Sequence, residues 1–281
     1  MARYITKVMA HWLDRGASGW RLDAAYAVAP QFWRKVIPPV RERQPESWFA
    51  GEVIHGDYVG YVAESGLDSI TQYELWKALW SSLNDSNFFE LAHALERHNQ
   101  FSEHFLPLTF IGNHDVTRIA SQLTEPRHLG VALAVLMTVA GSPSIYYGDE
   151  QGMQGVKEER FGGDDAVRGA FPGYPHDLEE SGWPIFHLHQ ELIALRRRHS
   201  FLSGSRIEVE HLTNEQLAFR SRRRLHPGQG DSDCVTVLLN IADHDSKFPV
   251  TDIGSIEAAS DPRPPHDAPY TLAPHSWAIY A

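Results

Sequence analysis

Three short apolar segments of this sequence each end in a carboxylate. They are GWRLD at Asp23, WFAGE at Glu52 and TFIGNHD at Asp115. One βα unit takes about 30 residues, so Glu52 lies one unit after Asp23 and Asp115 lies about two units further on. The carboxyl ends of parallel strands meet on one rim, where the active sites of α/β barrels lie. The spacing therefore predicts that the three side chains share one rim.

The first 200 residues alternate between two hydrophobic patterns. Helical spacing of apolar residues predicts helices over 2–15, 31–43, 87–98, 127–140 and 184–198. Strand-like runs lie at 20–25, 47–54, 67–73, 106–112 and 144–147. Strands that alternate with helices indicate parallel pairing through right-handed crossovers. The predicted fold class of this part is α/β.

The pattern changes after about residue 204. Short β-like runs at 207–211, 217–220, 234–239 and 277–280 are separated by loops rich in Pro, Gly and Asp. This pattern is typical of a small antiparallel β domain. We predict a mobile loop at 226–233.

Composition excludes several classes of function. Lys and Arg number 25 against 36 Asp and Glu, a net charge of −11, which disfavours nucleic acid and anionic membranes as partners. The single cysteine, Cys234, permits neither an intrachain disulfide nor a thiolate metal cluster. The sequence has no apolar run of membrane-spanning length. The first residues lack the apolar segment of a secretory signal, so the expected location is cytoplasmic.

Carboxylates that share a rim repel one another, and their surroundings can give them different roles. Arg21 lies two residues before Asp23 and points to the same face of its strand, which favours an ionised Asp23. A carboxyl held against apolar walls has a raised pKa and can donate a proton. One nucleophile and one acid, acting on an oxocarbenium-like transition state, are what glycoside hydrolysis requires.

The segments GWRLDAAYAVA, FAGEVI and FIGNHDVTRIAS resemble three of the four signature regions of the α-amylase superfamily, glycoside hydrolase family 13. SPSIYYGDEQGM resembles the family's eighth strand with the loop that follows, and DDAVRGAFP resembles the next segment. The resemblance implies catalytic roles for Asp23 as nucleophile, Glu52 as general acid and base, and Asp115 as the residue that binds and distorts the sugar. It implies substrate-binding roles for Arg21 and His114.

The implied function is a retaining α-glycoside hydrolase that acts on α-1,4-glucans or maltodextrins through a covalent glycosyl-enzyme. Retention requires carboxyl groups roughly 5–5.5 Å apart. The chemistry needs no cofactor and no metal. A transglycosidase of the same family, a catalytically inactive fragment or partner, and a divalent-metal hydrolase built on the same carboxylates are the alternatives.

One signature of the family, an Asp…Asn-His motif after its third strand, is not in this sequence. The match begins at the helix before the fourth strand, so we expect a partial (β/α)8 TIM barrel through helix 8 over 1–203. A C-terminal β-sandwich domain over 204–281 follows. We expect a fragment whose partner is the missing N-terminal half of the barrel. Tyr26 and Ala27 stand where many α-amylases have Lys-His, which leaves structural calcium open and favours maltodextrin-acting relatives.

Simpler structural interpretations exist for the same residues. Asp23 could cap a helix, Glu52 could lie in a solvated loop, and the Asn-His-Asp sequence at Asp115 suits a turn. Tyr146 and Tyr147 are predicted to be core residues. For Arg168, one hypothesis is a contact with an acidic residue of the sugar site.

Overall fold

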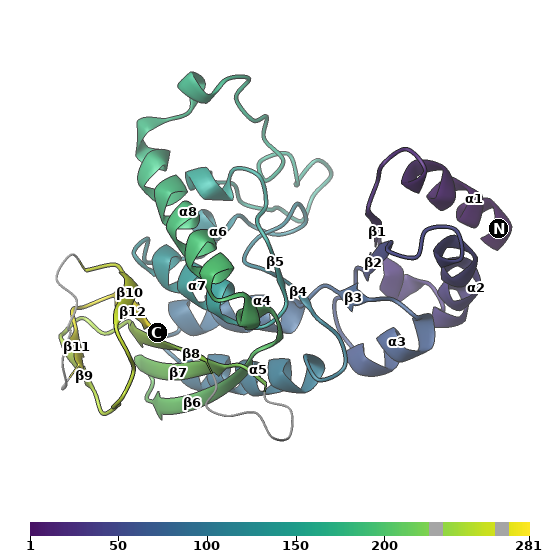
Figure 1. The fold of residues 1–281 in the computed structure, drawn as a ribbon. Coiled ribbons are helices and arrows are strands. Elements are labelled where there is room, and N and C mark those ends of the chain that lie inside the picture. The colour runs from purple at the N-terminus through teal and green to yellow at the C-terminus, as the bar shows by residue number, and fades with distance from the viewer. Residues whose placement is uncertain (225–232, 262–269) are drawn as a thin grey trace.

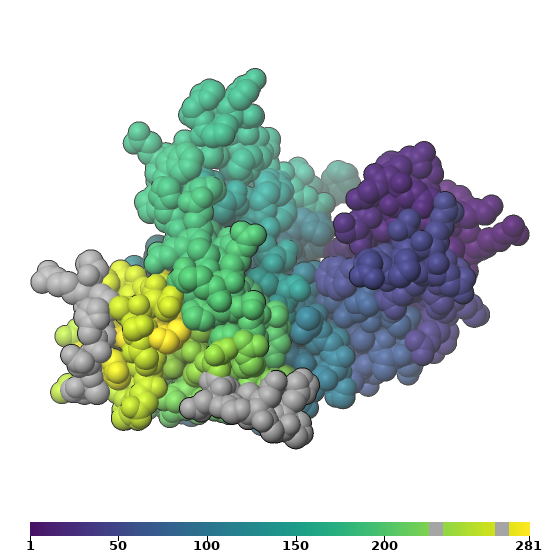
Figure 2. Space-filling view, viewed as in Figure 1, coloured from purple at the N-terminus to yellow at the C-terminus, as the bar shows by residue number. Residues whose placement is uncertain are grey.

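A computed structural model describes residues 1–224, 233–261 and 270–281. Figure 1 shows two bodies joined side by side, with the N-terminal helices α1 to α3 at one end and the C-terminal sheet at the other. The space-filling view in Figure 2 shows an open notch between the N-terminal helices and the teal-coloured segments on the upper side of the molecule.

Five short parallel strands follow one another in sequence order. β1 (Gly19–Leu22), β2 (Trp48–Gly51) and β3 (Ser69–Ile70) pair in parallel, as do β4 (Leu108–Phe110) and β5 (Ser142–Ser144). A parallel bridge between Thr71 and Leu108 joins the two groups. Among the described residues, β1 pairs only with β2, and β5 pairs only with β4. These strands therefore form an open arc with two free edges, consistent with a partial barrel.

Eight α-helices accompany the strands in the described part of the chain. Their bounds are α1 (Ala2–Leu13), α2 (Pro30–Arg41), α3 (Tyr58–Ser65), α4 (Tyr73–Asn84), α5 (Phe88–Phe101), α6 (Ile119–Gln122), α7 (His128–Thr138) and α8 (Trp183–Arg198). The five predicted helices are present, and α2 begins at Pro30, where proline's missing N–H costs nothing. The described helices include none with the length and apolar character needed to cross a membrane.

The predictions missed the three helices α3, α4 and α6, and they extended a strand over 67–73. In the structure the strand is only two residues long, and Tyr73 is already the first residue of α4. Only two residues separate the end of β3 from the start of α4. So short a segment shows no change from strand to helical periodicity, and the sequence pattern therefore does not reveal the boundary.

The helices bury two cores. One lies between α1, α2 and the strands β1 to β3 and includes Met9, Val36 and Phe49. The other lies between α4, α5, α7, α8 and the C-terminal sheet. Every residue of α7 is buried, as expected for a helix that is apolar on all sides. The helix contacts α8 on the barrel side and β8 and β12 of the C-terminal sheet.

The C-terminal part is antiparallel. β10 (Ile256–Ala259), β12 (Ser276–Tyr280), β8 (Cys234–Asn240), β7 (Gln216–Arg222) and β6 (Arg206–Leu212) form one sheet in that order. β9 (Ser246–Phe248) pairs with β11 (Tyr270–Leu272) as a two-stranded ribbon. The loop predicted at 226–233 lies, apart from residue 233, outside the described residues.

The two faces of the larger sheet pack against different parts of the chain. Phe219, Val237 and Ile279 belong to the same core as α7. Alternate residues such as Leu238 and Tyr280 pack against the β9–β11 ribbon. One face of this sheet covers helices of the barrel part, because β6 contacts α5, β8 and β12 contact α7, and β10 contacts α8.

Candidate active site

The predicted rim residues lie at the carboxyl ends of their strands. Asp23 directly follows β1 and Glu52 directly follows β2, while His114 and Asp115 lie in the loop after β4. Asp23, Glu52, His114 and Asp115 line one cleft of about 660 Å³. The structure therefore brings these four side chains together.

Arg21, near the end of β1, joins the first two carboxylates. One nitrogen of its guanidinium group contacts the Asp23 carboxylate, and Nη2 lies 3.0 Å from Oε1 of Glu52. The parallel register of β1 and β2 places Leu22 opposite Gly51, so Asp23 and Glu52 leave their strands at the same level. A cation between two acids reduces their mutual repulsion.

The two carboxylates differ in their exposure to solvent. The Asp23 side chain is 79% exposed, whereas that of Glu52 is 7% exposed. Oε2 of Glu52 accepts a 2.7 Å hydrogen bond from the backbone amide of Ala24. Oε1 accepts a longer one of 3.4 Å from the hydroxyl of Tyr73. Asp23 is therefore open to a ligand, and Glu52 is held in a fixed orientation.

Tyr73, which sequence reasoning missed, adds an aromatic wall to the cleft together with Trp76. Both are on the first turn of α4 and line the cleft. The Tyr73 hydroxyl accepts a 2.9 Å hydrogen bond from the amide of Asn113. Burial raises the pKa of Tyr73 to about 12, so its hydroxyl remains a donor toward Glu52 at neutral pH. Tyr73 was missed because the strand predicted over 67–73 included it as its last residue, whereas it is the first residue of α4.

Asp115 is held from several directions. The Asn113 side chain accepts a hydrogen bond from the Asp115 amide at 2.8 Å, and His114 Nε2 lies 3.1 Å from Asp115 Oδ2. Arg168 Nη2 is 2.8 Å from Asp115 Oδ1, while its Nε donates to the carbonyl of His114. The hypothesis that Arg168 contacts an acidic residue of the site is confirmed.

A second cation, Lys157, was not anticipated. Its Nζ donates to the backbone carbonyl of Asp115 at 2.8 Å and lies 3.5 Å from Asp164. Arg168 also pairs with Asp164 at 2.9 Å. Lys157 and Arg168 come from the long loop between β5 and α8, and both line the cleft. This loop therefore brings two cations to the cleft, where both contact Asp115 and both pair with Asp164.

Asp149 supports the site from behind. It is buried and pairs with the buried guanidinium of Arg118 at 2.9 Å, and burial raises its pKa to about 7 although Arg118 opposes the shift. A Cβ on Gly112 would come within 2.3 Å of Asp149 Oδ2. Only glycine fits this close approach at the end of β4. The rings of Tyr146 and Tyr147 pack on Arg118 at 4.6 and 5.1 Å.

No group of three or more His, Cys, Asp or Glu side chains in the described ranges is arranged to hold a metal ion. The Tyr26 amide donates to the carbonyl of Glu52 at 3.1 Å.

Comparisons with known proteins point to one family. The model of the alpha amylase catalytic domain matches residues 1–181. A cyclomaltodextrinase from a Bacillus species is 28% identical over 248 residues, which cover 84% of this chain and 41% of that protein. A 4-alpha-glucanotransferase from Thermotoga neapolitana is 33% identical over 162 residues, covering 53% of this chain and 34% of that protein. The chain thus spans less than half the length of these relatives.

Solved structures agree on the fold. The crystal structure of an alpha-amylase from H. orenii superimposes with a TM-score of 0.80 at 20% sequence identity, covering 99% of this chain and 63% of that one. The match extends over both the parallel strands and the C-terminal sheet.

Proposed function

The chain belongs to the α-amylase catalytic-domain family, and from this premise we propose that it hydrolyses α-1,4-glucosidic bonds of maltodextrins with retention of configuration. Arg21 carries the proposal, because it contacts both an exposed Asp23 and a buried Glu52. The cyclomaltodextrinase and 4-alpha-glucanotransferase among the matched relatives support an α-glucan substrate.

In the proposed first step, a carboxylate oxygen of Asp23 attacks the anomeric carbon, and the bond from that carbon to the glycosidic oxygen breaks. Glu52 gives its proton to the departing oxygen, so the leaving sugar departs as a neutral alcohol. The product of this step is a glycosyl ester on Asp23. In the second step Glu52 takes a proton from water, the water oxygen attacks the same carbon, and Asp23 is released as a carboxylate.

The other polar groups would bind the sugar ring. Asp115 and His114 would hydrogen-bond its hydroxyls, and the contacts of Arg168 and Lys157 with Asp115 would fix the carboxylate that receives them. Trp76 offers a flat face for a sugar ring next to the acid. Hydrogen bonds that strengthen as the ring flattens lower the barrier to reaction.

A transglycosidase would use the same covalent intermediate with a sugar hydroxyl in place of water. We propose hydrolysis as the principal reaction because the cyclomaltodextrinase matches 84% of this chain and the 4-alpha-glucanotransferase 53%. No structural calcium is proposed.

We further propose that additional parallel strands pair with the free edges of β1 and β5. Exposed strand edges offer unpaired N–H and C=O groups, and an arc of five strands does not close a barrel. The exposed aromatic side chains of Tyr4 and Trp12 on α1 support a covering segment. Turnover by the 281-residue chain at the same rate as with a covering segment would contradict this part of the proposal.

The stereochemistry of the product tests the function. With maltoheptaose as substrate, proton NMR during the first minutes should detect α-anomeric reducing ends before mutarotation. Initial release of the β-anomer would contradict the covalent mechanism. Absence of hydrolysis, by the chain alone and with a covering segment, would contradict the proposed function.

A further inference from the structure

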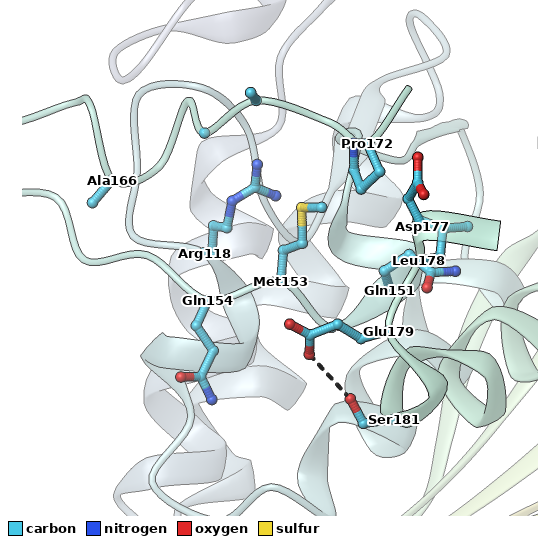
Figure 3. Close-up of a pocket in the computed structure, with 13 residues that line it drawn as sticks. Arg118, Gln151, Met153, Gln154, Ala166, Pro172, Asp177, Leu178, Glu179 and Ser181 are labelled. Atoms are coloured by element: carbon cyan, nitrogen blue, oxygen red, sulfur yellow. Dashed lines mark hydrogen bonds between the residues drawn. The ribbon is translucent and has the colours of Figure 1, made fainter. Parts of the chain in front are cut away.

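Cavities outside the catalytic cleft differ in the character of their linings. The cavity in Figure 3 lies beside the loop that carries Arg168, and polar side chains such as those of Gln154 and Glu179 surround it. Another cavity, of about 640 Å³, has apolar walls that include Leu129, Ile185 and Leu188. Its volume lies within the range of small-molecule sites. We call it the junction cavity.

The junction cavity lies where two barrel helices meet the C-terminal sheet. Leu129 and Gly130 come from the first turn of α7, Ile185 and Leu188 from the first two turns of α8, and Trp277 from β12. Among the described residues, this cavity and the catalytic cleft share no lining residue. A molecule in the junction cavity would therefore contact the barrel part and the C-terminal sheet at once, away from the cleft.

The indole N–H of Trp277 is the polar group that this cavity leaves open. Trp277 is 2% exposed, and its Nε1 donates to no acceptor within the described part of the chain. Unlike the unpartnered nitrogens of Trp80 and His189, which are sealed from solvent, this atom keeps accessible surface, and it faces the cavity. A Cβ on Gly130 would come within 2.5 Å of Nε1, so glycine leaves room in front of the N–H. Buried donors without an acceptor are rare in proteins.

The other polar side chains of the lining are already engaged. Arg127 pairs with Glu125 at 2.8 Å. The ring nitrogens of His275 are both hydrogen-bonded, one to His128 at 2.9 Å and one to Asp243 at 2.7 Å. Partners are also present for the remaining polar side chains of the lining, Ser260, Asp261 and Ser276.

This combination selects the class of ligand. A sugar would lose the hydration of many hydroxyl groups and find one free donor, and an ion would lose its hydration without gaining a counter-charge. An apolar body gains free energy by leaving water for the apolar walls. One acceptor oxygen on that body would satisfy Nε1 of Trp277. The lining therefore favours an uncharged, mainly apolar molecule that carries one hydrogen-bond acceptor.

We propose that the junction cavity is a binding site for a small aromatic ketone or a molecule of the same chemistry, whose oxygen accepts a hydrogen bond from Nε1 of Trp277. The bound molecule contacts α7, α8 and β12 together. Because it binds only the folded junction, it stabilises the contact between the barrel part and the C-terminal sheet. This proposal is independent of the hydrolytic function.

The test is a titration of the protein with acetophenone, followed by two-dimensional proton–nitrogen NMR. The sequence has eight tryptophans, and the indole signal that is missing from a Trp277→Phe variant identifies Trp277. This signal should move downfield and saturate. Ethylbenzene has a similar shape but no oxygen, so it should bind about twofold to tenfold more weakly, the usual effect of one hydrogen bond.

Two variants separate the hydrogen bond from the apolar walls. Trp277→Phe keeps an aromatic ring and loses the N–H, so acetophenone and ethylbenzene should bind it equally, as followed at the backbone amide of Gly130. Leu188→Ala removes part of a wall and should weaken acetophenone binding about fivefold or more. Ile193→Ala is the matched control and should bind as the unaltered protein does. Ile193 is half-buried on the same helix and packs on the same core, but it does not line the cavity.

Several results would overturn the proposal. One is a Trp277 indole signal that does not respond to acetophenone, and another is equal affinity of the unaltered protein for acetophenone and ethylbenzene. A stronger response of this signal to maltose, or to the charged analogue benzoate, would contradict the proposed class of ligand. Equal binding by the Leu188→Ala and Ile193→Ala variants would place the ligand elsewhere.

Discussion

The backbone amide of Ala24 donates a 2.7 Å hydrogen bond to Oε2 of Glu52. Ala24 directly follows Asp23 and has a left-handed backbone conformation, with φ of 43°, which is uncommon for a residue with a side chain. The turn that ends β1 therefore presents the Asp23 carboxylate and at the same time orients the neighbouring carboxyl. This link between two strand ends is the local basis of the proposed mechanism.

Replacing Glu52 with Gln should remove proton transfer while leaving the nucleophile in place. Turnover of maltoheptaose should fall by about 10²–10⁴-fold, the usual contribution of general acid–base catalysis. The first step on α-glucosyl fluoride, whose leaving group needs no proton, should be far less affected. Glu64→Gln on α3 is the control. Equal losses on both substrates would contradict the acid role.

Replacing Tyr73 with Phe should lower kcat about tenfold, because Glu52 loses a hydrogen-bond donor and Asn113 loses its acceptor. The fold should persist, since the aromatic ring remains. Tyr4→Phe changes an exposed tyrosine of α1 in the same way and should leave kcat unchanged. Steady-state kinetics on maltodextrin give kcat for both variants. A kcat of the Tyr73→Phe variant equal to that of the Tyr4→Phe control would exclude a positioning role for the Tyr73 hydroxyl.

Replacing Arg168 with Gln should raise KM about tenfold or more, because Asp115 loses a charged partner at 2.8 Å. Arg160→Gln is a matched control from the same loop, where the arginine pairs only locally with Glu158. Unchanged KM in the Arg168 variant would show that the loop does not organise the sugar site.

Stability should depend on pH through Asp149. Its pKa is about 7 in the folded protein and near 3.8 when unperturbed, so the native state binds its proton more tightly than the unfolded chain. The stability contributed by this carboxyl is present below about pH 4 and is lost as pH rises toward 7, by at most about 1.4 kcal/mol per pH unit.

Asp149→Asn removes that titration. The free energy of unfolding of the variant relative to the unaltered protein should therefore rise between pH 4 and 7. Urea unfolding at several pH values measures the difference. A difference that is constant across this range would place the Asp149 pKa near its ordinary value.

Chelation should leave the reaction unchanged. The cations near the three carboxylates are side chains, namely Arg21, Lys157 and Arg168, and the proposed steps use only Asp23 and Glu52. Turnover should be the same before and after dialysis against EDTA, with circular dichroism as the control for folding. Lost turnover with the fold intact would favour a divalent-metal hydrolase.

The positions of the rim carboxylates could be predicted from the sequence because a carboxylate after a short apolar run is a local signal. Asp23, Glu52 and Asp115 each follow such a run, and their spacing reflects the repeat of the βα unit. Tyr73 gave no such signal, since it begins α4 only two residues after β3. Lys157 reaches Asp115 from 42 positions away through a loop without periodicity, and only the folded chain reveals such a contact.

The central claim is that Asp23 forms a covalent bond to the sugar. A fluorinated glucosyl fluoride, incubated with the Glu52→Gln variant, slows release of the intermediate enough for trypsin digestion and mass spectrometry. The peptide spanning residues 22–34 contains Asp23 as its only carboxylate side chain and should gain the mass of one fluoroglucosyl group. A label on the peptide that carries residue 52 instead, or an unlabelled protein despite turnover of the reagent, would contradict the account.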